Sequence, residues 1–358
     1  MNPVLQLGDI ASVVMGQAPA GKDCNKEGNG YPFVKAGEFS ADRPVIREWT
    51  TNPLKKAKDG DVLVCVVGAT AGKVNLGIDC AIGRSVAAVR PLPQRLDTSY
   101  LHHFLKTKTL VLRQGSQGLA QGVITREMLL SIEIPLPPLE EQRCIAAILD
   151  KAKALETLAE KASRLHEGLI DAFFLSRVGN PAKDDWPTKQ AGTMCLSDVA
   201  HIRTGKLDAN AATPNGQYPF FTCSRTTLSI DSFCFDGEAI LVAGNGDLNV
   251  KRHSGKLNAY QRTYIISPKS ASPEEADYIY SLLRLYIAKL RSLSIGGVIK
   301  YIKLPFLSDL PVGPIDSGVV LEISSLQRSL SASSSLRSTA LSRIDSLASS
   351  LQTGLMDG

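Results

Sequence analysis

The sequence lacks a long hydrophobic run. No stretch of its 358 residues approaches the roughly 20 apolar residues that a membrane-spanning helix needs. The first ten residues contain Asp9 and no lysine or arginine, so we expect no secretion signal. The sequence therefore favours a cytoplasmic protein, and its 44 % of apolar residues are enough to build a folded one.

Paired cysteines and metal-binding motifs are also missing. Seven cysteines are scattered along the chain, none of them in a C-x-x-C motif, and the five histidines do not lie beside them at metal-ligand spacing. An odd number of scattered cysteines is typical of reduced thiols. We therefore expect neither a disulfide framework nor a metal site.

Catalytic motifs are absent as well. The sequence has no Asn-Pro-Pro-aromatic or Asp-Pro-Pro-aromatic tetrapeptide of amino-methyltransferases, no G-x-S-x-G and no H-E-x-x-H. Residues 68–74 are one residue too short for a phosphate-binding loop and end in Val74, where a hydroxyl is needed. His102 and His103 are interpreted as surface residues of a helix, and Asn245 with Asp247 as a tight turn more readily than a cation site. We predict a binding protein that is not an enzyme and has no cofactor of its own.

The chain contains an internal repeat. Several segments recur in the same order: Leu7-Gly-Asp-Ile-Ala as Leu196-Ser-Asp-Val-Ala, Tyr31-Pro-Phe as Tyr218-Pro-Phe, Asp59-Gly-Asp-Val-Leu-Val as Asp236-Gly-Glu-Ala-Ile-Leu-Val, Gly122-Val-Ile as Gly297-Val-Ile, and Ile134-Pro-Leu-Pro-Pro as Leu310-Pro-Val-Gly-Pro. Arg84, seven residues before Pro91, matches Arg262, six residues before Pro268. So many ordered matches predict two similar structural units.

Each repeat has the same layout, a mixed block followed by a long helix. We expect α+β domains over residues 1–137 and 179–314, and helices within 138–178 and 315–358. Short β-rich runs bounded by glycine and proline, at 62–67, 86–90, 239–243 and 264–266, predict strands. Residues 99–113 and 274–291 have apolar residues at three- and four-residue spacing and predict helices inside the domains.

Both long helices carry a heptad pattern of apolar residues. The two seams, related by an offset of 178 residues, include Ile145, Ile148, Leu155, Leu169 and Phe173 in the first helix and Ile323, Leu326, Leu330, Ile344, Leu347 and Leu351 in the second. A helix of about 38 residues spans roughly 57 Å, too long to be packed inside either domain. We expect the two helices to pair with each other as a coiled coil. The alternative is that each helix covers only its own domain.

The positive charge lies in the two domains. Residues 1–137 carry +4 and residues 179–314 carry +3, whereas 138–178 and 315–358 carry −1 each. Two weakly basic domains suit a polyanionic partner.

One stretch resembles the specificity subunit of type I restriction–modification enzymes. It runs from Ile132-Glu-Ile-Pro-Leu-Pro-Pro-Leu-Glu-Glu-Gln-Arg to Asp150, after Gly118-Leu-Ala-Gln-Gly-Val-Ile. Leu7-Gly-Asp-Ile, Tyr31-Pro-Phe-Val and Gly60-Asp-Val-Leu-Val resemble that family's target-recognition domains. The resemblance implies two such domains, each reading half of a split double-stranded DNA site, and an antiparallel coiled-coil spacer with pseudo-two-fold symmetry. It also implies two methyltransferase subunits that bring S-adenosylmethionine and, in the restricting complex, motor–nuclease subunits.

The second half departs from the family pattern. Asp316-Ser-Gly-Val stands where the first copy has Glu140-Glu-Gln-Arg, so the resemblance leaves open whether both helices bind a methyltransferase equally well. Two alternatives remain for the whole chain: a DNA-targeting subunit of another modification or phage-defence system, and a coiled-coil scaffold that never contacts DNA.

The motifs do not say which residues touch DNA. Cations in polar or glycine-rich loops can reach phosphates, arginine and lysine can pair with guanine, and asparagine with adenine. The candidates on this basis are Lys22, Lys35, Lys73, Arg84 and Arg126 in the first domain, and Lys206, Arg225, Asn245, Lys251, Arg252 and Arg262 in the second. A solvated surface charge is the alternative for each of them. Arg84 and Arg262 are the strongest, because both copies have an arginine there.

Overall fold

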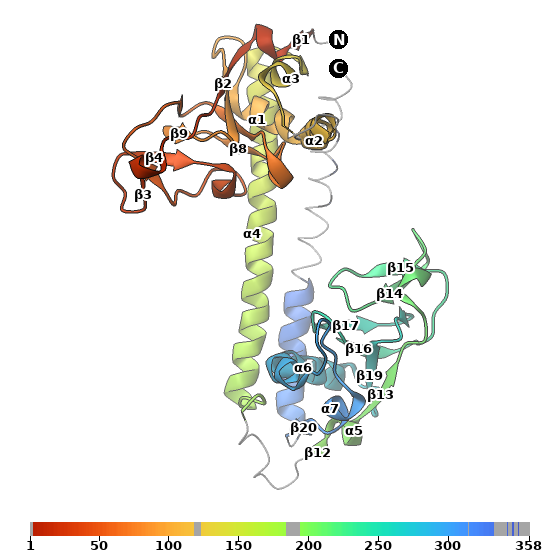
Figure 1. Ribbon diagram of the computed structural model, residues 1–358. Helices are drawn as coiled ribbons and strands as arrows, with labels where there is room; N and C mark the ends of the chain where they lie inside the picture. The colour runs from red at the N-terminus through yellow and green to blue at the C-terminus, as the bar shows by residue number, and fades with distance from the viewer. Residues whose placement is uncertain are drawn as a thin grey trace. The chain divides into compact units, whose positions relative to one another are not determined.

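The computed structural model describes residues 3–117, 123–183, 194–313 and 315–332, together with residues 342, 346 and 350 (Figure 1). Contacts divide the chain into two units, the first reaching to Leu158 and the second beginning at Ala159. The division between them therefore falls inside the longest helix. The domain boundaries expected from the sequence stay a prediction.

The first unit is built on an antiparallel sheet with the strand order β2-β10-β7-β8. These strands are β2 (Ala11–Met15), β10 (Val86–Pro91), β7 (Val62–Cys65) and β8 (Val74–Leu76). A second sheet has more strands but fewer residues, and we call it the smaller sheet. Its order is β3-β5-β4-β9-β6, and its strands are β3 (Cys24–Asn25), β5 (Trp49–Thr50), β4 (Tyr31–Val34), β9 (Cys80–Ile82) and β6 (Lys56–Ala57). The strands predicted at 62–67 and 86–90 are thus present.

Three short helices and a two-stranded pair complete the first unit. The helices are α1 (Thr98–Thr107), α2 (Thr109–Gln117) and α3 (Arg126–Leu130), and the pair is β1 (Val4–Gln6) with β11 (Glu133–Pro135). The helix predicted over 99–113 is broken at Lys108. The reason is tertiary: the Thr109 hydroxyl donates to the Gly72 carbonyl at 2.9 Å, so the loop before β8 is packed against the break.

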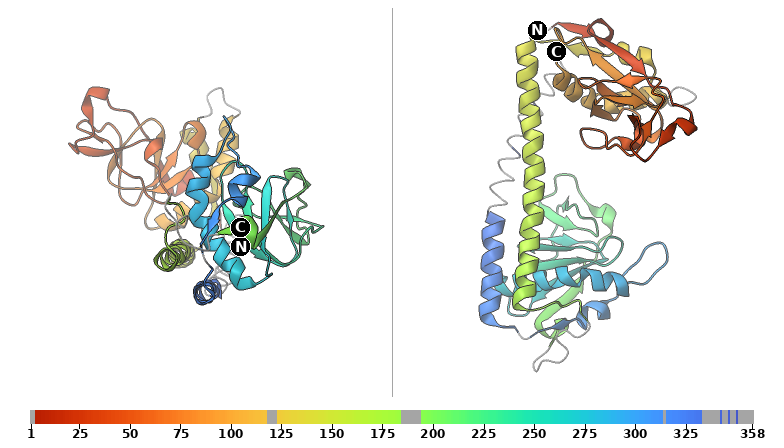
Figure 2. Two further views of the ribbon diagram at one scale, coloured as in Figure 1. Left: turned by 90° about the horizontal axis from the view of Figure 1, so that it is seen from below. Right: turned by 90° about the vertical axis from the view of Figure 1, so that its left-hand side faces the viewer.

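The second unit repeats this plan (Figure 2). Its main sheet has the order β13-β19-β16-β17, made of β13 (Ala200–Thr204), β19 (Thr263–Pro268), β16 (Glu238–Ala243) and β17 (Val250–Ser254). The smaller sheet is β15 (Leu228–Ile230), β14 (Tyr218–Phe221) and β18 (Asn258–Ala259), and the two-stranded pair is β12 (Met194–Cys195) with β20 (Pro311–Val312). The helices are α5 (Leu196–Val199), α6 (Pro273–Leu293), α7 (Leu304–Ser308) and a helical run over 317–332.

Strand register corrects two of the sequence matches between the copies. Ile124 donates its N–H to Val66, and Ile302 donates in the same way to Gly244, so Ile124 is equivalent to Ile302. Gly297-Val-Ile, which we matched to Gly122-Val-Ile, instead belongs to a hairpin that ends at Tyr301. Likewise β11 and β20 align Ile134 with Val312 rather than with Leu310. Backbone hydrogen bonds thus show which residues of the two copies are equivalent, whereas sequence identity over three to five residues does not.

Helix α4 (Leu139–Arg177) is 39 residues long, as the sequence predicts, and contributes to both cores. Ala146 and Leu149 are buried in the core of the first unit, and Phe174 is buried in that of the second. The run 317–332 begins at the position equivalent to Leu139 and belongs to the second unit. There Arg177 pairs with Glu322 at 3.1 Å.

The predicted seams are partly buried and partly exposed. Ile145 and Phe173 pack against the two cores, Ile323 is buried, and Leu326 and Leu330 are half-buried. The remaining described members of the first seam are exposed: Ile148, Leu155 and Leu169. The second-seam positions Ile344, Leu347 and Leu351 lie outside the described residues. Pairing along the full length of the helices stays a prediction.

His102 and His103 are buried, not exposed as we predicted. Helix α1 contacts the sheet through β7 and β8, and the side chain of His103 reaches Asp150 of α4. His103 Nε2 lies 2.7 Å from the Asp150 carboxylate. His102 has no hydrogen-bond partner for either ring nitrogen among the described residues, and burial lowers the pKa of its imidazole to about 4.

Candidate nucleic-acid interface

The candidate interface is one end of each main sheet. At this end the two strands that flank a central strand reach their last residues, and the central strand, β10 or β19, begins. In the first unit β2 and β7 end there, and the turn between β9 and β10 crosses it. In the second unit β13 and β16 end there, beside the turn between β18 and β19. We call this surface the turn edge of each unit. Turns at strand ends expose side chains on a rigid support, which suits recognition.

Arg84 lies on the turn edge of the first unit. Its turn is fixed on both sides, because Gly16 donates to Val86 at 2.9 Å and Val66 donates to Ser85 at 2.9 Å. The Arg84 side chain is exposed and has no hydrogen bond or ion pair to another described residue. A free guanidinium on a fixed backbone can bind a phosphate or a base edge.

Arg262 lies on the turn edge of the second unit. Gly205 donates to Thr263 at 3.1 Å and Gly244 donates to Arg262 at 2.8 Å, the same pattern as in the first unit. This pattern makes Arg262 equivalent to Ser85, and Gln261 equivalent to Arg84. The expectation that the two arginines occupy one position is therefore wrong by a residue. Arg84 and Arg262 still lie in equivalent turns of the two units.

Glycine is required where each turn meets the sheet. A Cβ atom on Gly16 would lie 2.2 Å from the Gly83 carbonyl oxygen, and one on Gly205 would lie 1.9 Å from that of Ala259. These distances are far below any tolerated contact, so no other residue fits. Gly16 and Gly205 thus allow the turn to pack closely against the end of β2 in the first unit and of β13 in the second.

Two further candidates in the first unit are held internally. Lys35 lies beside the turn, but its ammonium pairs with Glu48 at 2.6 Å. The Lys73 ammonium donates to the Phe39 carbonyl at 3.1 Å. The segment 68–74 contains the short helical turn Gly68–Thr70, and its lysine, Lys73, is held by this hydrogen bond.

Three candidate cations are exposed and form no hydrogen bond or ion pair with another described residue. Lys22 lies in the short helical turn Gly21–Asp23, Arg126 is the first residue of α3, and Lys206 follows Gly205 at the end of β13. Only Lys206 lies on a turn edge. Lys22 and Arg126 lie elsewhere in the first unit.

An arginine–aspartate cluster borders the turn edge of the second unit. Arg225 pairs with Asp247 at 2.7 Å, and Arg291 pairs with the same carboxylate at 2.9 Å. The hydrogen bond from Arg225 is the main reason why the pKa of Asp247 lies below its usual value. Asn245 forms a β-bridge with Tyr301, so the tight turn expected at 244–247 is tied to the following hairpin.

Lys251 and Arg252 have structural contacts. Lys251 donates to the carbonyls of Thr222 and Ser224, and burial lowers the pKa of its ammonium. Arg252 binds the carboxylates of Glu238 and Asp277. Because removing one partner of such a pair leaves a buried charge, we attribute these two residues to stability rather than to DNA contact.

The structure also shows a residue whose role the sequence did not reveal. Gln142, in the segment that carries the family resemblance, is fully buried. Its carboxamide accepts from the Asp97 N–H at 2.8 Å and donates to the carbonyls of Arg95 and Pro137 at 2.9 and 2.8 Å. Gln142 therefore joins the start of α4 to the loop before α1. Val320, at the equivalent position of the second copy, is buried among apolar residues instead.

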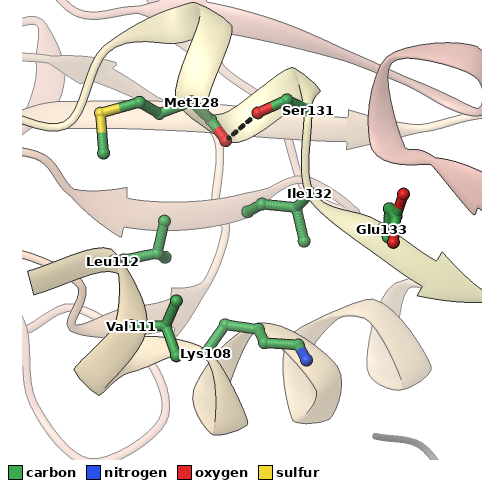
Figure 3. A pocket seen from close by; sticks show the side chains of 7 residues that line it. All are labelled: Lys108, Val111, Leu112, Met128, Ser131, Ile132 and Glu133. Atoms are coloured by element: carbon green, nitrogen blue, oxygen red, sulfur yellow. Dashed lines mark hydrogen bonds between the residues drawn. The ribbon is translucent and has the colours of Figure 1, made fainter. Parts of the chain in front are cut away.

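Two pockets lie in different settings. One of about 300 Å³ opens at the turn edge of the second unit, lined in part by Gln261, Arg262 and Tyr301. Another, of about 410 Å³, lies between α2, α3 and β11 and is mainly apolar (Figure 3). In it the Ser131 hydroxyl donates to the Met128 carbonyl at 3.2 Å. The first pocket places hydrogen-bonding groups beside the exposed Arg262.

The described residues contain no cluster of three or more metal-ligating side chains. No helix in the described part of the chain combines the length and the hydrophobicity needed to cross a bilayer.

The fold and the turn edges define a protein built from two similar α+β units, the first followed by the 39-residue helix α4 and the second by the helical run 317–332. The chain belongs to the type I restriction modification DNA specificity domain family, whose model matches residues 3–165 and 189–313. It is 44 % identical over 128 residues to the type I restriction enzyme EcoDI specificity subunit of Escherichia coli, covering 36 % of this chain and 27 % of that protein. It is 28 % identical over 219 residues to the type I restriction enzyme MjaVIII specificity subunit of Methanocaldococcus jannaschii, covering 57 % of this chain and 50 % of that protein. The matches thus span about a quarter to a half of these relatives.

Solved structures share the fold over nearly the whole chain. The S subunit of a type I restriction–modification system from M. genitalium has a TM-score of 0.64 at 17 % identity, covering 99 % of this chain and 95 % of that one. A chain from a structural study of complex assembly and conformational transition of the type I R-M system has a TM-score of 0.53 at 14 % identity, covering 99 % and 98 %.

Proposed function

We propose that this chain is the DNA-recognition subunit of a type I restriction–modification system and reads a bipartite site, one half with each unit. The observation that carries the proposal is the turn edge. Both units build it from the same strand ends and the same glycine, yet they place different side chains on it, Arg84 in one and Gln261 with Arg262 in the other. A constant frame with variable turns is what reading two different sequences requires.

The chemistry of the turn edges suits base and phosphate contacts. Arg84 and Arg262 can pair with guanine or neutralise a phosphate, and Gln261 can pair with adenine. Lys206 adds an exposed cation next to the Gly205 turn. Lys22 and Arg126, which lie elsewhere on the first unit, are then suited to phosphate contacts that hold the register.

The long helices set the distance between the two half-sites in this proposal. The exposed seam residues Ile148, Leu155 and Leu169 would be covered if the second helix paired with α4 along its length. The pairing would run antiparallel, because Arg177 near the end of α4 meets Glu322 near the start of the run 317–332. An antiparallel pair of similar helices gives the chain its pseudo-two-fold symmetry.

The proposed partners supply the chemistry. Two methyltransferase subunits would bring S-adenosylmethionine, and motor–nuclease subunits would join in a restricting complex. The described residues of this chain supply recognition and a frame, and no step of methyl transfer or cleavage is assigned to them. The family to which the chain belongs is named for DNA specificity, which supports this division of labour.

A coiled-coil scaffold that never contacts DNA is the second candidate. The exposed apolar residues of α4 favour it as much as they favour a spacer. It gives no reason, however, for free arginines on matching turns of both units. A DNA-targeting subunit of another modification or defence system would use the same turn edges and differ only in its partners.

Binding of the full chain to a random-sequence duplex pool tests the proposal. Fluorescence anisotropy should show binding that weakens as salt rises, since phosphate contacts release counterions. Repeated selection from the pool should then enrich two short sequences separated by a fixed gap. No binding at low salt would favour the scaffold, and one contiguous enriched sequence would contradict recognition by two units.

A further inference from the structure

Two of the most exposed apolar side chains of the second unit lie next to each other at the tip of a hairpin. The hairpin runs from Ile295 to Tyr301, and its tip carries Val298, whose side chain is completely exposed, and Ile299, which is 63 % exposed. Hairpin tips usually carry polar residues or glycine, so two adjacent aliphatic residues here are unusual. No contact within the described chain accounts for them.

The hairpin is firmly held at its base. Ile295 and Tyr301 exchange two backbone hydrogen bonds of 2.9 and 2.8 Å. Gly246 also donates to the Lys300 carbonyl at 3.0 Å, which ties the hairpin to the turn 244–247. Gly296 has a φ of +114° and a Cβ there would lie 2.6 Å from the Ile299 carbonyl oxygen, so the tight bend needs glycine.

The hairpin therefore extends the turn edge of the second unit. Tyr301 lines the same pocket as Gln261 and Arg262. The residues around its base are mostly cationic: Lys300 is exposed, and Arg225 and Arg291 both pair with Asp247. Hence the apolar tip stands out from a positively charged surface.

We infer that the Val298–Ile299 tip is a wedge that enters the stack of the DNA half-site bound by the second unit. This inference rests on the proposed function. Proteins that bend DNA insert aliphatic side chains between base steps while neighbouring cations hold the phosphates. The fixed hairpin, the two aliphatic side chains and the cationic base supply these parts. The wedge adds selectivity, because the base steps that unstack most readily accept it at the lowest cost.

The test uses the full chain, without other subunits, and a duplex selected from the random pool. Adenine is replaced by 2-aminopurine, one position at a time, through the second half-site. The chain should raise 2-aminopurine fluorescence at one step only, where stacking is lost. The variant Val298→Ser with Ile299→Ser should abolish that rise and weaken binding about tenfold at fixed salt, with the salt slope unchanged, because no charge is removed.

Leu228→Ser is the matched control, since Leu228 is an exposed aliphatic residue of the same unit on β15. It should leave both the fluorescence rise and the affinity unchanged. A rise that persists in the double variant, or the absence of any rise with a duplex that the wild type binds, would overturn the wedge. Failure of the wild type to bind any duplex would overturn the proposed function itself.

Discussion

At the scale of single residues, the two turn-edge arginines carry the strongest claim. If Arg84 binds a phosphate, Arg84→Ala should weaken binding to every duplex and lower the salt slope by about one. If it binds guanine, discrimination at one position should fall by roughly 1–3 kcal/mol. The same holds for Arg262→Ala. Anisotropy titrations at several salt concentrations separate the two outcomes.

Lys161→Ala is the control for the arginine variants, because Lys161 is an exposed cation of α4 away from the turn edges. It should change neither the slope nor the discrimination. Arginine variants that match the control in both measurements would show that Arg84 and Arg262 are ordinary solvated charges.

Gln142 is predicted to be a stability residue. Gln142→Ala removes three hydrogen bonds from a fully buried side chain and leaves the Asp97 N–H and the carbonyls of Arg95 and Pro137 without this partner. The free energy of unfolding of the first unit should fall by about 2–3 kcal/mol. Gln94→Ala, at an exposed glutamine of the same loop, should cost less than about 0.5 kcal/mol. Equal effects of the two substitutions in denaturant titrations would refute this role.

His102 should make stability depend on pH. Burial holds the pKa of its imidazole at about 4 in the folded protein, below the usual 6.5. The unfolded chain therefore takes up a proton that the folded chain does not. The free energy of unfolding should fall as the pH drops from about 6.5 to about 4, by up to roughly 3 kcal/mol, and this contribution should be constant above pH 7.

His102→Leu should remove this part of the pH dependence, measured by denaturant titration between pH 4 and pH 8. At pH 7.5 it should stay within about 1 kcal/mol of the wild type, since the ring nitrogens have no partner to lose among the described residues. His201→Gln, at an exposed histidine on β13, reports the effect of losing any histidine. An unchanged slope in His102→Leu would show that other groups cause the acid sensitivity.

At the scale of elements, the sequence predicts the main parts well. The strands around 62–67 and 239–243, the helix α6 and the 39-residue α4 all lie where the patterns place them, because glycine, proline and apolar spacing act locally. The break at Lys108 was missed, since it depends on contact between Thr109 and Gly72, which lie far apart in sequence.

The candidate site was less predictable, because charge alone does not show what a side chain contacts. Arg84 and Arg252 are both arginines near glycine-rich loops, yet one is free and the other binds two carboxylates. An acidic residue follows the Asp-Gly dipeptide in both copies. In the first unit this residue is Asp61, which pairs with Arg90 of β10, and in the second it is Glu238, which pairs with Arg252 of β17. Only the strand order tells which arginine is used. The apolar tip at Val298 was likewise obscured by a false match to Gly122-Val-Ile.

The helices should act as a ruler. Seven residues inserted after Glu156 and after Ser334 keep both seams in phase and add roughly 10.5 Å. At about 3.4 Å per base pair, the gap between half-sites should grow by about three base pairs. Methylation mapping should then find both half-sites unchanged and the gap longer.

A four-residue insertion at the same places is the control for the ruler. It turns the seam out of phase and should destabilise the pair. A seven-residue variant that stays active with the original gap would mean that the helices do not set the distance.

At the scale of the whole molecule, the chain contains one structural unit twice. The same strand order in the main sheet, the same turn glycine and an equivalent start of the following helix occur in both copies. Such a duplication allows each copy to change its turns without disturbing the other. It predicts that the specificity of each half-site belongs to one unit alone.

An exchange of residues 1–137 for the same block of a homologous specificity subunit tests that central claim most directly. The measurement is single-molecule sequencing of adenine methylation in cells that carry the methyltransferase and either the exchanged or the original chain. We expect one half of the methylated sequence to change while the other half and the gap stay the same. A change in both halves, or in neither with methylation retained, would contradict it.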